Sequence, residues 1–277
     1  MAPHGNAHNR AMRSTSEEEQ GPEAESGARG PRGIQSVEVG GQLLKVLAHT
    51  GRRMALKDLA READMSPAKA HPYLVSFGKL GLIEQDGVSG HYGLGPLALQ
   101  LGLISLQQVD PVQLANAELP ALAQRLGHTV SASVWGARGP TIIRVEEGPT
   151  AVYVAMRHGT TASVRHTASG QVFAAYRPRE DVAMALASDG DAGALDDPAF
   201  AAELDRVRQT RLGVVNNHLI TGISALASPV FNGFGQLVLV LACIGPSATL
   251  DTDLDGPVAL ALKACAQDLS RRLGATG

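Results

Sequence analysis

One stretch, residues 56–94, constrains the fold more than any other part of the sequence. It begins with a helical pattern whose apolar positions are Leu56, Leu59, Ala60 and Ala63. The polar turn Asp64-Met65-Ser66-Pro67 interrupts this pattern. A second helical pattern follows and ends at Gly81, with an inner face predicted to hold Ala70, Leu74, Val75 and Phe77. Two helices separated by so short a turn predict a helix-turn-helix.

The stretch continues with two short strand patterns, residues 82–85 and 91–94, joined by a turn at residues 86–90 that contains two glycines. A helix predicted over residues 36–48 precedes it, with Val39, Leu43, Val46 and Leu47 on one face. Three helices followed by a β-hairpin form the layout of a winged helix-turn-helix. Because that module places its second motif helix in the DNA major groove, the sequence predicts DNA reading rather than chemistry.

The segments that flank this module differ from it in composition. Residues 1–33 are rich in Gly, Ser, Glu, Arg and Pro and have almost no large apolar side chains, so we expect a disordered tail. After Gly95-Pro96, residues 97–109 form an uncharged apolar helical pattern that must bury much of its surface, as a linker helix paired with its copy in a dimer would. Asp110-Pro111 then breaks the pattern. The predicted division is a tail (1–33), a winged helix-turn-helix (34–95), a linker helix (96–110) and a C-terminal domain (111–277).

The distribution of charge limits how strongly one copy of the chain can hold DNA. The 277 residues suffice for two domains, and the formal net charge is only -3. Residues 34–96 have a balance of +1, from seven basic and six acidic side chains. Because phosphate affinity scales with the number of cationic contacts, we expect weak binding by one copy and a dimer or tetramer on two half-sites.

Cysteine, histidine and hydropathy patterns bound the remaining classes of protein. Cys243 and Cys265 are isolated, which argues for a reducing compartment and against a structural zinc site. The nine His show no metal-binding spacing, and neither a metal nor a cofactor is predicted. No apolar run reaches the roughly 18 residues of a membrane span, and the N-terminus lacks the apolar core of a signal peptide. We therefore expect a cytoplasmic protein without a membrane partner.

From residue 111 the pattern alternates between helices and strands. Helices are predicted at residues 111–126, 169–176, 180–187, 198–211 and 254–273. Strands are predicted at residues 129–135, 141–147, 152–156, 223–231 and 237–244. An antiparallel pair near each end, with helices between them, predicts an α+β domain of the sensor kind.

Three separated stretches resemble the IclR family of bacterial transcription regulators. The first is the winged helix-turn-helix, which ends in HYGLGPLALQLG. The second is HTASGQVFAAY at residues 166–176, similar to the Thr-x-x-Gly-Lys opening of a helix in that family. The third is GISALASPVFNGFGQLVLVLACIGPSATL at residues 222–250, which resembles the paired strands of the family that end in Gly-Pro-Ser. Together the three stretches span nearly everything after residue 34.

This resemblance implies an N-terminal DNA-binding domain and a C-terminal effector-binding domain of GAF-like shape. Such regulators are dimers or dimers of dimers, bind a double-stranded DNA operator, and switch neighbouring catabolic or transport genes. Their effectors are small carboxylates, aromatic acids or other catabolic intermediates. We expect this chain to be a repressor, although the sequence leaves activation open.

The candidate DNA-binding residues lie on the second motif helix, before the module and at the wing. They are Arg52, Arg53, Lys57, Ser66, Ala68, Lys69, His71, Tyr73, Ser76 and His91. Lys69 and His71 suit phosphate or guanine edges, and Ser66 before Pro67 suits an N-cap. Tyr73 has core packing as an alternative, and for Arg52 and Arg53 the alternative is a solvated basic turn.

Pro72 departs from the pattern, since the family usually has Arg at this position of the helix. Proline removes a backbone donor and crowds the carbonyl four residues earlier, which costs roughly 3 kcal/mol in a helix interior. It also removes a cationic contact with DNA. We therefore predict a kink or a late helix start, and weaker or altered DNA recognition.

The candidate effector-binding residues follow from the same resemblance. They are Trp135, Met156, Ala168, Ser169, Gly170, Val215, Asn216, Asn217, His218, Ala225, Ala242 and Ile244. The backbone N–H groups at residues 168–170 suit a carboxylate at a helix start. Small and apolar side chains at positions that are more polar in acid-binding relatives favour a bulkier, partly apolar ligand such as an aromatic acid. Core packing is the alternative for Trp135 and Met156, and a surface loop is the alternative for His218.

Two other classes of function compete with this interpretation. An enzyme is disfavoured, because the sequence has no Gly-x-Ser-x-Gly, no phosphate-binding Gly-x-x-x-x-Gly-Lys and no His-Glu-x-x-His, and His166 with Ser169 lacks a third partner for a triad. The second is a ligand-sensing regulator whose DNA binding is weakened by Pro72 and which acts through a protein partner.

Overall fold

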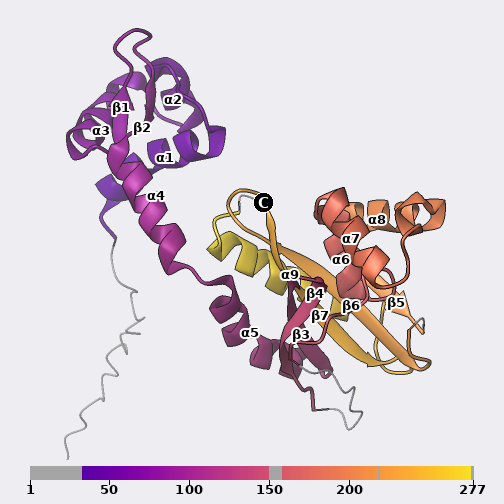
Figure 1. Ribbon diagram of the computed structural model, residues 1–277. Coiled ribbons are helices and arrows are strands. Elements are labelled where there is room, and N and C mark those ends of the chain that lie inside the picture. The colour runs from indigo at the N-terminus through magenta and orange to yellow at the C-terminus, as the bar shows by residue number, and fades with distance from the viewer. Residues whose placement is uncertain (1–32, 150–157, 218, 276–277) are drawn as a thin grey trace, which may run out of the picture.

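The computed structural model describes residues 33–149, 158–217 and 219–275, so the predicted tail and the predicted strand at 152–156 lie outside the described residues. The N-terminal part contains three helices and a hairpin (Figure 1). These elements are α1 (Gln35–Thr50), α2 (Leu56–Glu62), α3 (Pro67–Leu80), β1 (Ile83–Gln85) and β2 (Tyr92–Leu94). Strands β1 and β2 are antiparallel, with Ile83 opposite Leu94. The predicted winged helix-turn-helix is confirmed.

The core of this domain is built from the predicted apolar faces. Leu43 and Leu47 of α1, Leu59 of α2 and Leu74 of α3 are at most 2% exposed, and the hairpin adds Ile83. One prediction for α3 is wrong: Val75 is 44% exposed and faces away from this core. Since Val75 is one position after Leu74, it lies about 100° further around the helix, on the side that faces solvent.

Helix α4 (Pro96–Gln108) connects the two parts of the chain (Figure 1). Its sequence contains no charged residue. We expected most of this surface to be buried, yet several apolar side chains of the helix are more than 40% exposed: Leu99, Leu101, Leu103 and Ile104. A single copy of the chain therefore leaves α4 without the packing that its composition predicts.

In the C-terminal part of the chain, α5 (Pro111–Leu126) precedes a sheet in which the described residues form five strands. The strands are β3 (Thr129–Gly136), β4 (Gly139–Glu146), β5 (Gly213–Asn216), β6 (Ile223–Phe231) and β7 (Leu237–Pro246). The helices are α6 (Ala168–Tyr176), α7 (Arg179–Ser188), α8 (Pro198–Thr210) and α9 (Pro257–Arg272), with a short 3-10 turn at Ala194–Asp196. The predicted α+β class is confirmed.

The strand order is β4-β3-β7-β6-β5, and every neighbouring pair is antiparallel. Pairing of β3 with β7 joins the two predicted hairpins into one sheet, with Ser131 opposite Ala242. Strand β5 was not predicted from the sequence. Its four residues are short for a strand, and it pairs with β6 at the edge of the sheet.

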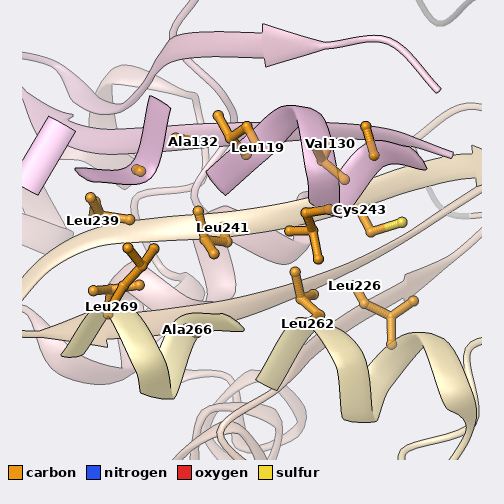
Figure 2. Packing of buried hydrophobic residues seen from close by; sticks show 14 of the residues in the cluster. Leu119, Val130, Ala132, Leu226, Leu239, Leu241, Cys243, Leu262, Ala266 and Leu269 are labelled. Atoms are coloured by element: carbon orange, nitrogen blue, oxygen red, sulfur yellow. The ribbon is translucent and has the colours of Figure 1, made fainter. Parts of the chain in front are cut away.

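Helices cover both faces of this sheet. On one face α5 and α9 pack against alternate residues of the strands, as Figure 2 shows for Leu119, Val130, Leu241 and Leu262. The other face carries α6, whose eight residues from Ala168 to Ala175 are all buried, and α8 packs on α6. Because strand side chains alternate between faces, neighbouring residues of β7 serve different cores: Leu241 and Cys243 serve the first, Ala242 the second.

Candidate nucleic-acid interface and ligand cavity

Helix α3 begins where the sequence predicts. Ser66 is the N-cap, and its Oγ accepts a hydrogen bond from the backbone N–H of Lys69 at 3.3 Å, while Pro67 takes the first helical position. Gly81 closes the other end in the left-handed conformation, with φ 76°. Both ends satisfy backbone groups that a helix would otherwise leave unpaired.

The outer face of α3 carries most of the predicted DNA-binding side chains on this helix. Residues three and four positions apart share this face, and all of them are exposed: Ala68, His71, Pro72, Val75, Ser76 and Lys79. Lys69 is exposed at the margin of the face. Tyr73 lies differently, because it is half-buried against the core and its ring covers Gly40 of α1. The outer face therefore combines a few cations with apolar groups.

Pro72 sits inside α3 without interrupting it. The helix runs as one element from Pro67 to Leu80, so the predicted late start is wrong. Proline deprives the carbonyl of Ala68 of its intrahelical donor, but both residues are exposed and water can replace the lost hydrogen bond. The carbonyl of Pro72 itself accepts a hydrogen bond from Ser76 Oγ at 3.0 Å.

Arg53 is bound to the wing. Its guanidinium contacts Glu84 of β1, and its Nη1 lies 3.6 Å from Asp86 Oδ2 at the start of the wing turn. Asp86 also accepts hydrogen bonds from the backbone N–H and the hydroxyl of Ser89 and from the backbone N–H of Val88, and these bonds hold its pKa below the usual range. Arg53 thus braces the hairpin, whereas Arg52 and Lys57 are exposed and have no ion pair among the described residues.

The tip of the wing has an unusual composition for a DNA-binding element. Residues 86–90 contain no basic side chain, and the side chain at the tip, Val88, is 99% exposed. His91 follows in a half-buried position. A wing of this kind can approach a groove through an apolar group and backbone N–H groups, not through a cation.

In the C-terminal domain, four of the predicted effector residues meet at one small cavity. They are Ala168, Val215, Ala225 and Ile244, contributed by α6 and by β5, β6 and β7. The cavity has a volume of about 70 Å³, and the rest of its lining is His166, Thr167, Leu219, Ile220, Ile223 and Ser224. We call it the effector cavity. Leu219 and Ile220 close one side of it, although both are more than half exposed.

The polar side chains of the effector cavity already have partners. Thr167 Oγ1 caps α6 by accepting from the N–H of Gly170 at 3.0 Å, and it donates to the carbonyl of Ser163 at 2.7 Å. Ser224 Oγ lies 2.8 Å from Ser247 Oγ. His166 Nε2 lies 3.1 Å from Asp191 Oδ2. The unengaged lining is therefore almost entirely apolar.

Other predicted effector residues lie beside this cavity without lining it. Gly170 packs so closely that an added Cβ would be 2.2 Å from the carbonyl oxygen of Ser163, and its N–H belongs to the Thr167 cap. Ser169 and Ala242 are buried in the core, while Asn216 is exposed at the end of β5.

Asn217 has an evident structural role. It adopts a positive φ of 52°, which asparagine tolerates better than most residues. Its Oδ1 accepts hydrogen bonds from the N–H of Gly222 at 2.8 Å and from Ser247 Oγ at 2.9 Å. These bonds stabilise the loop before β6 and engage the side-chain oxygen of Asn217. Two further predicted residues, Met156 and His218, lie outside the described residues.

Trp135 packs in a neighbouring aromatic group. Its ring centroid lies 5.6 Å from that of Phe173, and the guanidinium of Arg177 lies 5.5 Å from the indole centroid. It does not line the effector cavity. The predicted set also missed six lining residues: His166, Thr167, Leu219, Ile220, Ile223 and Ser224. The sequence signal for Leu219 and Ile220 was an apolar pair after a polar loop, and the signal for His166 was a histidine just before a helix cap.

Among the described residues, no group of three or more His, Cys, Asp or Glu side chains is placed to hold a metal ion. None of the helices in the described ranges is long and apolar enough to cross a membrane.

Comparison with known proteins agrees with this arrangement. Residues 36–87 match the family model for the IclR helix-turn-helix domain, and residues 104–271 match that for the bacterial transcriptional regulator IclR C-terminal domain. The crystal structure of HmgR from Pseudomonas aeruginosa is 35% identical, with a TM-score of 0.79 over 88% of this chain and 100% of that one.

Curated relatives agree with the family models. The glycerol operon regulatory protein of Streptomyces coelicolor is 29% identical over 88% of this chain and 98% of its own length. The regulator KdgR of Dickeya chrysanthemi is 24% identical over 80% of this chain and 75% of its own. These families and relatives are transcriptional regulators and not enzymes. The chain belongs to the IclR family of DNA-binding transcriptional regulators.

Proposed function

We propose that this chain is a ligand-responsive regulator of a catabolic or transport operon, whose effector is a small, largely apolar organic acid. In this proposal the winged helix-turn-helix (34–95) reads the operator, residues 96–110 link the domains, and residues 111–277 sense the effector. The observation that carries the proposal is the effector cavity, where residues chosen from the sequence for ligand binding meet beside the start of α6.

On the DNA side, Lys69 and His71 are the proposed contacts with phosphates or guanine edges, since both are exposed and neither has an ion pair among the described residues. Ala68 and Val75 lie on the same outer face and suit the methyl groups of thymine. Arg52 and Lys57 suit phosphates of the backbone, which position a protein without specifying sequence. Ser66, Ser76, Tyr73 and His91 remain candidates of lesser weight, and Arg53 acts by bracing the wing.

On the effector side, the lining favours a particular chemistry. Val215, Ile223 and Ile244 offer apolar contact, while Ala168 and Ala225 leave space. The start of α6 offers the positive end of a helix dipole to a carboxylate. A cavity of about 70 Å³ is small for a complete aromatic acid, so binding must move the exposed Leu219 and Ile220 outward. That displacement is the proposed first step of the response.

A second copy of the chain is the proposed partner of α4. This helix has no charged side chain and exposes Leu99, Leu101, Leu103 and Ile104. Pairing of two such helices removes this surface from water and brings two winged helix-turn-helix domains together. Two domains bound to two half-sites make more phosphate contacts than one, which compensates for the weak DNA affinity expected of a single domain with little positive charge. The assembly is proposed to be a homodimer or a dimer of dimers.

Titration of the full-length protein against a fluorescent fragment of the DNA upstream of its own gene, at two salt concentrations, tests this function. We expect sequence-selective binding that weakens as salt rises, and a change in operator affinity when phenylacetate is added but not when succinate is added. Ala225→Leu should fill the cavity and abolish the phenylacetate response while operator affinity without ligand is retained. Absence of selective binding would contradict the DNA-reading function.

The second candidate function is a ligand sensor with weakened DNA binding that acts through a protein partner, and Pro72 is the observation that favours it. The Pro72→Arg variant separates the two functions in the same titration. If the wild-type protein binds no upstream DNA and Pro72→Arg restores binding, the sensor function is supported. Selective binding by the wild-type protein supports the operator-reading function instead.

A further inference from the structure

A larger cavity lies at the other end of β6 from the effector cavity. Its volume is about 550 Å³, and it lies between the end of β6, the β6–β7 turn and the last turns of α9. Its lining includes Arg211, Phe231, Lys263, Gln267 and Arg271. We propose that this α9 cavity is a second ligand site, which takes a small organic anion with a flat apolar body.

Hydrogen bonds between distant parts of the chain hold the walls of the α9 cavity together. Ser270 of α9 is only 8% exposed, and its Oγ accepts a hydrogen bond from the N–H of Phe231 in β6 at 3.0 Å. The N–H of Gly233 in the turn donates to the carbonyl of Leu273 at 2.9 Å. Because these bonds join the turn to the end of α9, the cavity is formed before any ligand arrives.

The charge of the lining selects an anion. Three cationic side chains, Arg211, Lys263 and Arg271, contribute to it, and none of its described lining residues is acidic. Arg271 is paired with Asp268 at 2.8 Å, and Lys263 Nζ donates to the carbonyl of Leu254 at 3.2 Å. Arg211 has no carboxylate partner among the described residues. Lys263 also has no carboxylate partner there, and a neutral carbonyl does not cancel its charge. Arg211 and Lys263 therefore both leave a positive charge for a ligand.

The backbone at Arg211 has an unusual conformation for arginine. Arg211 ends α8 in the left-handed conformation, with φ 57° and ψ 29°, where glycine is the usual residue. Its N–H donates to the carbonyl of Val207 at 2.8 Å, and its carbonyl accepts from Ser228 Oγ at 3.2 Å. The structure thus imposes a conformation that arginine disfavours. Glycine or asparagine would adopt this conformation more readily, so replacing Arg211 by either should not strain the backbone.

Phe231 determines the remaining part of the ligand. The guanidinium of Arg211 lies 5.7 Å from the centroid of the Phe231 ring, so cation and aromatic surface are adjacent. A carboxylate or phosphate can bind the guanidinium with two hydrogen bonds while a flat apolar body contacts the ring. The volume is within the range of about 300–1,000 Å³ that small-molecule sites occupy, and it exceeds what an inorganic ion requires.

The two cavities are separate places on the sheet. Residues Ile223 and Ala225 of β6 line the effector cavity, whereas Ser228 and Phe231 line the α9 cavity. The nearest of these residues, Ala225 and Ser228, are three positions apart, which corresponds to about 10 Å at roughly 3.3 Å per residue, and their side chains lie on opposite faces of the sheet. A ligand in one cavity therefore does not occupy the other, and this proposal goes beyond the proposed effector function.

Calorimetric titration of the full-length protein with phenyl phosphate tests the proposal. Two control probes are inorganic phosphate, which lacks the ring, and benzyl alcohol, which lacks the charge. We expect phenyl phosphate to bind more tightly than either. Arg211→Gly and Arg211→Asn should weaken it at least tenfold. Because glycine and asparagine tolerate a positive φ, the unfolding temperature without ligand should stay the same or rise. Arg138→Gly, at an exposed arginine of the β3–β4 turn, should leave binding unchanged.

Three results would overturn the proposal. The first is that the wild-type protein does not bind phenyl phosphate, and the second is that the Arg211 variants bind it as tightly as the wild-type protein does. The third is that Ala225→Leu loses binding while the Arg211 variants keep it, which would assign the ligand to the effector cavity. The same variants should keep the operator affinity of the wild-type protein in the absence of ligand. Failure of the wild-type protein to bind operator concerns the proposed function alone, because the calorimetric readout does not involve DNA.

Discussion

In the winged helix-turn-helix the candidate functional side chains lie outside the core, whereas in the C-terminal domain they belong to it. Lys69 and His71 are exposed on α3, and the helix is held by Leu74 on its other side. Ala168 and Val215 line the effector cavity and are also members of the core on that face of the sheet. Mutation of a candidate residue in the first domain should therefore weaken DNA binding without lowering the free energy of unfolding. In the second domain such a mutation should lower both ligand binding and the free energy of unfolding.

The largest expected effect tests the second half of this contrast. Phe173→Ala removes a ring that is 0% exposed, packs against Trp135 and belongs to α6, the helix whose start lines the effector cavity. We expect a loss of about 3–5 kcal/mol in the free energy of unfolding of the C-terminal domain, together with the ligand response. Denaturant unfolding followed by Trp135 fluorescence measures the first, and the operator titration the second. A stable variant that has lost only the response would contradict the shared role.

A smaller effect tests the first half. Lys69→Ala and His71→Ala should each weaken operator binding by about 1–3 kcal/mol if the side chain reads a base. If Lys69 contacts a phosphate, the slope of log affinity against log salt should fall by about one. The free energy of unfolding should change by less than about 0.5 kcal/mol, because both side chains are exposed. Equal loss of operator and effector binding would show that the two domains do not divide the functions as proposed.

Ser66→Ala tests a residue that has both a structural role and a proposed role in DNA binding. Its hydroxyl caps α3, the residue is exposed, and it is also a proposed DNA contact. Loss of the cap should cost the N-terminal domain about 0.5–2 kcal/mol. Ser66→Asp, which restores the cap, should recover the stability in a thermal unfolding experiment, and any remaining loss of operator affinity then reports a direct DNA contact. If Ser66→Ala leaves stability unchanged, the cap contributes nothing measurable.

The smallest effect near neutral pH involves the thiols, which occur only in the C-terminal domain. Burial raises the pKa of Cys243 to about 12 and that of Cys265 to about 11. Both thiols should therefore react slowly with a thiol reagent at pH 8, Cys243 more slowly. Because the folded state favours the protonated form, this contribution to stability is complete below the ordinary pKa of 9.0 and is lost as pH rises toward 11–12. Alkaline unfolding should therefore begin in this domain. Rapid labelling of both cysteines at pH 8 would contradict the raised pKa values of the two thiols.

Much of the winged helix-turn-helix could be predicted because its signals are local. The Ser66-Pro67 cap, Gly81 and the apolar spacing each act within one or two turns of chain. Val75 was misplaced because it neighbours Leu74 in an apolar run, and only the direction of each side chain around α3 separates them. Pro72 was expected to delay the helix, but Ser66 and Pro67 start it five residues earlier.

The candidate effector cavity was predicted only in part, because its lining comes from four separate segments. The family resemblance predicted Ala168, Val215, Ala225 and Ile244. Leu219 and Ile220 were not predicted, because the course of the loop before β6 is what brings them to the cavity. Asn217 looked like a ligand contact because it is polar and near the site. Its hydrogen bonds to Gly222 and Ser247 belong to the loop itself.

The sequence by itself determined the order of the elements, the winged helix-turn-helix and the family, since hydrophobic periodicity, caps and turns are properties of short segments. Tertiary structure alone decided that the two predicted hairpins share one sheet through β3 and β7, and that residues 213–216 form its edge strand. It also decided the two cavities, because each needs residues far apart in the chain to come together: Ala168 with Ile244 in one, and Arg211 with Arg271 in the other. The pairing of distant strands and the packing of helices on them leave no short-range signal in the sequence, because those contacts exist only in the folded chain.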